Sequence, residues 1–233
     1  MQDFSPYQAF AKENFGFTYD DPQLLVTALT HRSYVNEHKK STKEHNERLE
    51  FLGDAVLELV VTEYLYKTYE ESEGILTNWR AALVRTESIG AAGAKLGLDQ
   101  LMRMSRGEKQ ASSPRARQQI LANAFEAVIG SIYLDKGYDE ASKFIHDNIL
   151  TTFEEILASG SWRDPKSRLQ EVAQSTDGHT PVYKVLEETG PDHDKTFTLG
   201  VYVAGKLRGK GTGPSKQVAQ QEAAKAALES YYK

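Results

Sequence analysis

The chain contains no cysteine, and this absence excludes several kinds of protein. Without thiols it can form neither a disulfide framework nor a thiolate metal site, and a Cys-His nucleophile is impossible. A chain without cysteine also suits a reducing, intracellular compartment. The remaining routes to catalysis depend on carboxylates, histidines, hydroxyls and metal ions bound through oxygen.

Long apolar runs are also absent. No stretch reaches the 18 or so apolar residues that a membrane span requires. The first ten residues, MQDFSPYQAF, lack the basic segment and the apolar run of a signal peptide. We therefore expect a cytoplasmic protein with no membrane partner.

Positive charge is scarce overall, because the formal net charge is −5 and the isoelectric point is about 5.7. A nucleic-acid binder is expected to be basic, so the total argues mildly against one. The distribution matters more than the sum. Acidic residues gather over 37–73, and basic residues gather over 103–117 and 206–216. A cation-binding site and a phosphate-binding surface can therefore coexist in this chain.

The hydrophobic pattern divides the chain of 233 residues into two parts. Residues 4–158 repeat apolar positions at helical spacing, with breaks at Asp21-Pro22, Glu73-Gly74, Ser113-Pro114 and Lys136-Gly137. After residue 160, strands are expected over 180–188, 197–204 and 206–211, between helices over 166–175 and 214–231. We predict an all-α domain over 1–158, a linker over 159–163 and a small α-β-β-β-α domain over 164–233.

The segment ERLEFLGDAVLELV places four carboxylates within a wedge of roughly 80° on one face of a helix. They are Glu47, Glu50, Asp54 and Glu58. An ordinary solvated helix face would explain them, but no lysine or arginine of the segment lies within the wedge. Gly53 in mid-helix costs about 1 kcal/mol relative to alanine, which indicates close approach of a ligand or another backbone. A bound divalent cation would offset the repulsion, because hard oxygen ligands suit Mg²⁺.

A second helix, ILANAFEAVIGSIYLD, carries Asn123 and Glu126 three residues apart and therefore on one face. Its other positions are almost all apolar or small, so we expect it to be buried. A buried carboxylate is costly without a partner. A buried salt bridge is one explanation for Glu126. The other is that Glu126 faces Glu50 and Asp54 across a shared metal ion.

Four segments of this part are similar to bacterial ribonuclease III. They are LLVTALTHRSYVNE, NERLEFLGDAVL, EGILTNWRAALVRTESI and ILANAFEAVIGSIYLD. With the C-terminal domain, the resemblance covers nearly the whole chain. It implies Mg²⁺-dependent hydrolysis of double-stranded RNA (Mn²⁺ can substitute) with no small-molecule cofactor. It further implies 5′-phosphate and 3′-hydroxyl ends, a short 3′ overhang, and a part in ribosomal RNA and mRNA processing.

The same resemblance assigns the residues of the site. It implies a metal set of Glu50, Asp54, Asn123 and Glu126, with catalytic roles for Asp54, Glu126, Glu47 and Glu73. The family normally has aspartate where this chain has Asn123. A neutral amide oxygen can still bind Mg²⁺, but we expect weaker metal binding at a site one unit less negative. The resemblance also implies a homodimer with Phe51 at the interface.

The last part of the chain, with GKGTGPSKQVAQQEAAKAAL, resembles a double-stranded-RNA-binding domain. The expected RNA contacts are Lys166, Arg168, Gln170, Glu171, His193, Lys206, Arg208, Lys210, Ser215 and Lys216. The first helix and His193 would meet minor grooves, and the others would meet phosphates near the start of the last helix. An ordinary solvated edge strand is the alternative for 206–216. Because Gln217 and Gln220 stand where the family often has basic residues, we expect weaker binding.

The basic stretch RGEKQASSPRARQQ lacks strong helical signals, so it is interpreted as a flexible loop. It could also contact the RNA backbone through Arg115 and Arg117. For the whole chain we consider a Mg²⁺-dependent endonuclease, a duplex-RNA binder with a weakened site, and a purely helical structural dimer. The intact acidic residues favour the endonuclease, and the structural dimer leaves the C-terminal domain unexplained.

Overall fold

The computed structural model describes residues 3–39, 42, 44–160, 162–191 and 195–231. It divides into two compact units, Met1–Ser159 and Gly160–Lys233. None of the helices within these described ranges is long and apolar enough to cross a membrane. The predicted fold class is confirmed: a helical first unit precedes a second unit in which a three-stranded antiparallel sheet lies between two helices in sequence.

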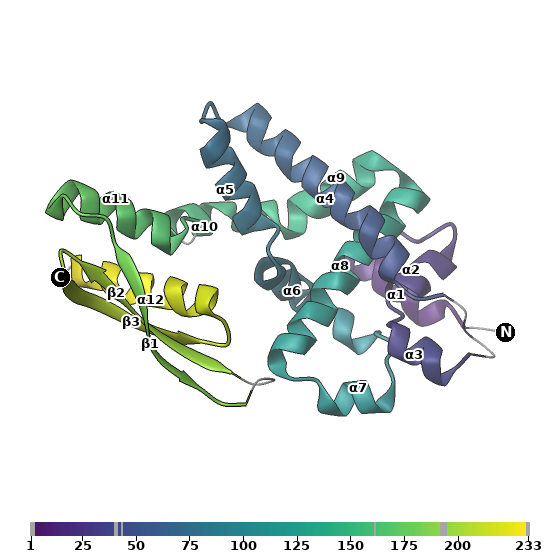
Figure 1. Cartoon of the computed structure of the whole chain (residues 1–233). Helices are drawn as coiled ribbons and strands as arrows, with labels where there is room; N and C mark the ends of the chain where they lie inside the picture. Colours follow the sequence, from purple (N-terminus) through teal and green to yellow (C-terminus); the bar gives the residue numbers. More distant parts are fainter. Residues whose placement is uncertain (1–2, 40–41, 43, 161, 192–194, 232–233) are drawn as a thin grey trace. The chain divides into compact units, whose positions relative to one another are not determined.

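The first unit is built around one long buried helix, α8, against which α2, α4, α6 and α9 pack (Figure 1). Residues 121–132 of α8 are almost all buried, as their apolar and small side chains predict. The helices of this unit are α1 (Ser5–Asn14), α2 (Pro22–Ala28), α3 (Arg32–Glu37), α4 (Glu47–Thr68), α5 (Glu73–Leu83), α6 (Thr86–Lys95), η1 (Leu98–Gln100), α7 (Arg106–Ala111), α8 (Pro114–Lys136), α9 (Tyr138–Asn148), η2 (Leu150–Thr152) and α10 (Phe153–Ser159).

Most helix boundaries follow signals that the sequence carries. The Asp21 side chain caps α2, which begins at a proline, and Gly137 with φ 86° ends α8. The break predicted at Glu73-Gly74 exists but lies one residue earlier, because α4 ends at Thr68 and α5 already begins at Glu73. Ser72 is the N-cap residue of that helix, and the acidic side chain of Glu73 in its first turn interacts favourably with the helix dipole.

The basic stretch after residue 105 is helical, so its interpretation as a flexible loop is wrong. Ser105 caps α7 by accepting a hydrogen bond from the Glu108 amide, and Ser113 caps α8 in the same way. Arg115 and Arg117 therefore lie in the first turn of α8. The two capping serines are the helix-start signals in this stretch, and the prediction of a loop from its basic composition overlooked them.

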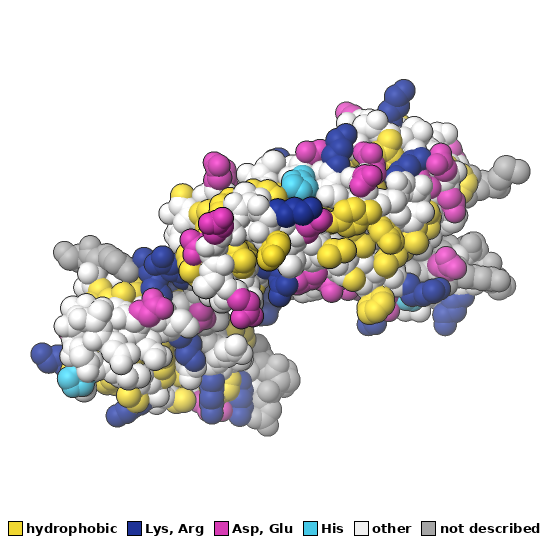
Figure 2. All heavy atoms as spheres, turned by 90° about the horizontal axis from the view of Figure 1, so that it is seen from above, with side chains coloured by type: hydrophobic (Ala, Val, Ile, Leu, Met, Phe, Trp, Pro, Cys, Tyr) yellow, Lys and Arg dark blue, Asp and Glu magenta, His cyan; other side chains and the backbone are white. Residues whose placement is uncertain are grey.

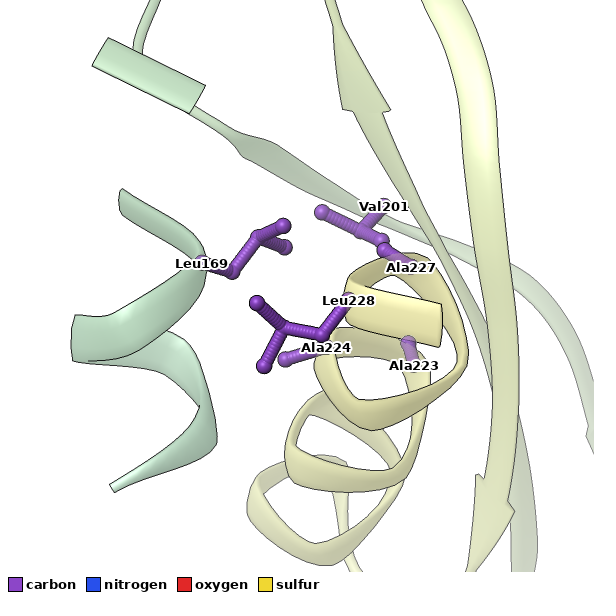
Figure 3. Close-up of a cluster of buried hydrophobic side chains, with 6 residues drawn as sticks. All are labelled: Leu169, Val201, Ala223, Ala224, Ala227 and Leu228. Atoms are coloured by element: carbon purple, nitrogen blue, oxygen red, sulfur yellow. The ribbon is translucent and has the colours of Figure 1, made fainter. Parts of the chain in front are cut away.

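The second unit contains α11 (Pro165–Asp177), β1 (Val182–Thr189), β2 (Thr196–Val203), β3 (Lys206–Gly213) and α12 (Lys216–Tyr231). The sheet order is β1-β2-β3, and α12 packs on β2 and β3 with α11 beside it. Small residues make this close packing possible, since a Cβ at Gly209 or Gly211 would collide with the α12 backbone. Figure 3 shows the core that results, made of Leu169, Val201, Ala223, Ala224, Ala227 and Leu228.

Candidate active site and RNA interface

The candidate active site lies where α4 and α8 touch through glycines. A Cβ placed on Gly53 would overlap the carbonyl oxygen of Glu126 and lie 2.6 Å from its carbonyl carbon. A Cβ placed on Gly130 of α8 would lie 2.3 Å from the carbonyl oxygen of Leu49 on α4. The close approach predicted for Gly53 is therefore to another backbone. It brings the turn of α4 that holds Glu50 and Asp54 against the turn of α8 that holds Glu126.

Glu126 lies among like charges. Burial, together with the neighbouring carboxylates of Asp54 and Glu50, raises the pKa of Glu126 to about 8. Among the described residues, no lysine, arginine or histidine forms an ion pair with Glu126. The salt-bridge explanation therefore does not hold. What remains is a carboxyl group at the helix crossing that pairs with no cation of the described residues.

Asn123 is oriented by two side chains. Its oxygen Oδ1 accepts a hydrogen bond of 2.7 Å from Nε2 of Gln119, one turn earlier on α8. Its amide group also hydrogen-bonds the carboxylate of Glu50, which lowers the pKa of that group, whereas burial, Glu47 and Asp54 raise it more strongly. In this arrangement Asn123 donates to Glu50, and the hydrogen bond from Gln119 uses one of the two lone pairs of its oxygen, which leaves the other for a cation.

The outer carboxylates of the α4 face have side-chain partners from outside that helix. Glu47 lies 3.6 Å from Arg32 of α3 and 3.9 Å from His45, and Glu58 lies 3.0 Å from Arg80 of α5. The sequence showed correctly that α4 has no lysine or arginine on this face. It could not show the partners of Glu47 and Glu58, which come from other segments. Among the described residues, the carboxylates without an ion-pair partner at the helix crossing are therefore Glu50 and Asp54 of α4 and Glu126 of α8.

Glu73 does not join this group within one chain. It opens α5, which follows the far end of α4. At about 1.5 Å per residue, that end of α4 lies about 20 Å from Asp54. Neither of the raised pKa values in the group includes Glu73 as a cause.

The donor set suits a hard divalent cation, because it offers three carboxylates and one amide oxygen. Over the described ranges, no three histidine, aspartate or glutamate side chains already stand close enough to hold a metal ion. The carboxylates are expected to stand apart, because they repel one another when no cation lies between them. The half-buried Glu126 carboxyl, which pairs with no cation of the described residues, is the observation that makes these residues fit a metal.

In the second unit, the start of α12 exposes a cation. Ser215 accepts a hydrogen bond from the Val218 amide, so the helix starts at Lys216 and not at the predicted residue 214. Lys216 is exposed, and its Nζ lies 5.5 Å from the centre of the Phe197 ring. Unpaired amides at a helix start attract phosphate, and the lysine adds full charge.

The candidate residues of α11 differ in their environment. Gln170 and Glu171 are exposed, while Lys166 and Arg168 are half-buried. Lys166 donates a hydrogen bond of 2.7 Å to Gln220 of α12 and lies 5.3 Å from the centre of the Tyr183 ring.

The basic residues of β3 do not share one face. Gly209 and Gly211 point at α12, so Lys210 between them points away from it. Arg208 forms an ion pair of 3.0 Å with Asp177 and lies over the Tyr231 ring. Lys206 is exposed at the start of the strand. The candidate residue His193 lies outside the described residues.

The two candidate arginines of the first unit are exposed, and Arg117 lies 3.8 Å from Asp99. Phe51 is also exposed on α4, with 81% of its surface accessible. It borders a hollow of about 820 Å³ whose apolar wall comes from Leu24, Leu49, Leu52 and Leu134. Figure 2 shows hydrophobic side chains gathered on the face of this unit that is seen from above.

Comparisons with known proteins agree with both units. The family described as Ribonuclease-III-like matches residues 21–153, and the double-stranded RNA binding motif matches residues 165–231. The protein named Ribonuclease 3 of Desulforamulus reducens is 45% identical, over 94% of this chain and 89% of its own length. The Ribonuclease 3 of Enterococcus faecalis is 44% identical, over 94% of this chain and 95% of its own.

A solved structure resembles the first unit. It is the nuclease domain of ribonuclease III from Campylobacter jejuni, described as having a region involved in dimer formation. The match has a TM-score of 0.51 and 39% identity, and it covers 60% of this chain and 96% of that one.

Proposed function

Because this chain belongs to the ribonuclease III family and is an endoribonuclease specific for double-stranded RNA, we propose that it cuts with Mg²⁺ bound at the crossing of α4 and α8. Mn²⁺ can replace Mg²⁺. The products carry 5′-phosphate and 3′-hydroxyl ends with a short 3′ overhang, and the substrates include ribosomal RNA and mRNA precursors in the cytoplasm. We assign catalysis to residues 1–158 and RNA binding to 164–233, with 159–163 as the linker.

The observation that carries this proposal is the uncompensated Glu126 carboxyl beside Asp54 and Glu50. A folded protein keeps such a group only where something offsets its cost. Glu50, Asp54, Glu126 and the amide of Asn123 would hold the ion. A bound divalent cation supplies an activated water and neutralises charge that grows on the phosphate.

The residues themselves have separable tasks. Without a cation, Glu126 holds a proton at neutral pH, because its pKa lies near 8. Gly53 and Gly130 fix the spacing of the two helices, and Asn123 turns its amide toward Glu50. We propose further catalytic roles for Glu47, at the margin of the site, and for Glu73, whose place beyond the far end of α4 requires a site completed by a second copy of the chain. Glu47 would be held in place by Arg32.

The function is tested by cleavage of a long RNA duplex labelled at its 5′ end, with Mg²⁺, with Mn²⁺ and with a chelator. We expect short duplex products with either metal and intact RNA with the chelator. Treatment of the products with phosphatase and ligase identifies their ends. RNA that is bound but never cut in any metal would favour a duplex-RNA binder with a weakened site and overturn the proposal.

Asn123→Asp should lower the Mg²⁺ concentration needed for half-maximal cleavage by roughly tenfold. The aspartate gives the metal a charged oxygen ligand in place of a neutral one. A carboxylate also cannot donate the hydrogen bond that Asn123 now donates to Glu50. The measurement is the cleavage rate against Mg²⁺ concentration for both proteins. Asn78→Asp is the matched control, because it makes the same chemical change at an exposed position on α5. Equal Mg²⁺ requirements for the parent and Asn123→Asp would argue against residue 123 as part of the metal site.

Lys216→Ala should weaken duplex binding by about tenfold for all sequences alike, because it removes a phosphate contact and no base contact. The slope of log affinity against log salt should become shallower by about 0.9. Fluorescence anisotropy with several RNA duplexes in chelator measures both quantities. Lys225→Ala is the control, since Lys225 lies nine residues on, on the opposite side of α12. A loss that depended strongly on sequence would contradict a phosphate role.

We propose that the chain acts as a homodimer in which the Phe51 side chain of each copy enters the hollow beside Phe51 on the other. An exposed phenylalanine next to an apolar hollow on the same surface suits a two-fold interface, where each patch meets its copy. Phe51→Ser should raise the dimer dissociation constant at least about a hundredfold, because two buried rings are lost. Sedimentation equilibrium measures it, with Leu207→Ser of the second unit as control. An unchanged constant would remove Phe51 from the interface.

A further inference from the structure

The contact between α11 and α12 places a lysine of α11, Lys166, against the surface of α12. Lys216 and Gln220 are four residues apart on α12, so their side chains are neighbours on one face of that helix. Lys166 of α11 donates its hydrogen bond of 2.7 Å to Oε1 of Gln220. The ammonium of Lys166 therefore lies one helical turn from the residue that opens α12.

Two further contacts hold Lys166 in this position. The ring of Tyr183 on β1 lies 5.3 Å from the ammonium, within the range of a cation–π interaction. The side chain is half-buried, which restricts the stem that a free lysine would swing through solvent. An ammonium has three donors, and Gln220 takes one of them. The remaining two can meet a phosphate without breaking the contact with α12.

We propose that Lys166, held by Gln220 and the Tyr183 ring, supplies a second phosphate-binding cation on the α12 surface, beside Lys216. This inference rests on the proposed function, because it concerns the same RNA surface. It changes the expected role of Lys166 from a minor-groove contact to a phosphate contact. It also gives Gln220 a positioning role: the neutral amide accepts from Lys166, whereas a cation there would repel it.

The inference makes an unusual prediction about added charge. Gln220→Lys puts one more positive charge on the protein, yet we expect the salt slope of duplex binding to stay at the parental value. Two ammonium groups at hydrogen-bond distance repel each other, so the pair should serve one phosphate site. Lys166→Met keeps the apolar stem and removes the charge, and it should make the slope shallower by about 0.9.

A relocation of the charge separates position from residue identity. The double variant Lys166→Gln with Gln220→Lys reverses the hydrogen bond and keeps one cation at the contact. We expect it to recover the parental slope and to bind within about threefold of the parent. Lys225→Met is the control for loss of a charge elsewhere on α12, where Lys225 pairs with Glu222. It should change the slope much less than Lys166→Met.

The experiment is anisotropy of the full chain with a labelled RNA duplex of about 20 base pairs, in chelator, across a salt series. Urea unfolding of each variant is measured alongside. The inference is overturned if Gln220→Lys steepens the slope by about 0.9, or if Lys166→Met lowers the urea midpoint and leaves the slope unchanged. A parent that shows no salt-dependent duplex binding would instead overturn the proposed RNA-binding function, and the inference with it.

Discussion

Glu126→Gln should reduce cleavage of duplex RNA by on the order of a thousandfold, which corresponds to about 4 kcal/mol of activation free energy. The substitution keeps the size of the side chain and removes its charge and one of its two carboxylate oxygens. Glu126 has no ion-pair partner among the described residues, so the substitution breaks no salt bridge that stabilises the fold. The measurement is the single-turnover cleavage rate at saturating Mg²⁺, together with duplex affinity in chelator. Affinity should stay within about threefold of the parent.

The same variant should change the pH dependence of stability in metal-free buffer. The pKa of Glu126 is raised from 4.5 to about 8 in the folded state by burial, Asp54 and Glu50. Between these two values the folded chain holds a proton that the unfolded chain releases, so parental stability falls as pH rises through this window. Glu126→Gln removes this contribution and should flatten the profile. Urea unfolding at several pH values measures it without any dependence on activity.

Glu58→Gln is the matched control for both experiments. It makes the same chemical change on the same face of α4, but Glu58 has a cation partner in Arg80 at 3.0 Å. It should cut near the parental rate and keep the fall in stability between pH 4.5 and 8. If Glu126→Gln also cuts at the parental rate, the metal-site assignment is wrong. If it neither cuts nor binds, the loss lies in folding, and the unfolding curves will reveal it.

The helical periodicity predicted the helices of the first unit well, and the change to strand patterns after residue 160 predicted the three strands of the second. Local patterns sufficed because the apolar positions of these helices and strands are the ones buried against neighbouring elements. Gly53 was informative for the same reason: a costly residue in mid-helix indicates a close contact, and the Glu126 carbonyl is that contact.

Other features depend on elements that meet only in the folded chain. The cations that pair with Glu47 and Glu58 come from α3 and α5, and no spacing within α4 could reveal them. On β3, sequence proximity suggested that Lys206, Arg208 and Lys210 act together. Strand alternation turns Lys210 away from α12, and Asp177 binds Arg208 from α11. Pairwise contacts of this kind need the tertiary structure.

Gly53→Ala should cost more than about 3 kcal/mol of unfolding free energy, because its methyl group would overlap backbone that cannot rotate away. The nearest atoms are the carbonyl of Glu126 and the Gly130 nitrogen, at 2.9 Å for the latter. The helices can only separate, which takes Glu50 and Asp54 away from Glu126. We therefore expect the folded fraction of this variant to bind Mg²⁺ more weakly as well. Urea unfolding with and without Mg²⁺ measures both effects.

Gly74→Ala isolates the effect of the helix crossing from the effect of replacing a helical glycine. Gly74 lies in the first turn of α5, and a Cβ there meets nothing within 4 Å. Alanine should be neutral or stabilising by up to about 1 kcal/mol at that position. Opposite signs for the two variants would show that backbone contact at Gly53 sets the spacing of the acidic cluster. If Gly53→Ala unfolds within about 0.5 kcal/mol of the parent, the crossing tolerates a methyl group. The cluster would then owe its spacing to side-chain packing around α8, and alanine substitutions at Leu49 and Val56 would be the variants that disturb it.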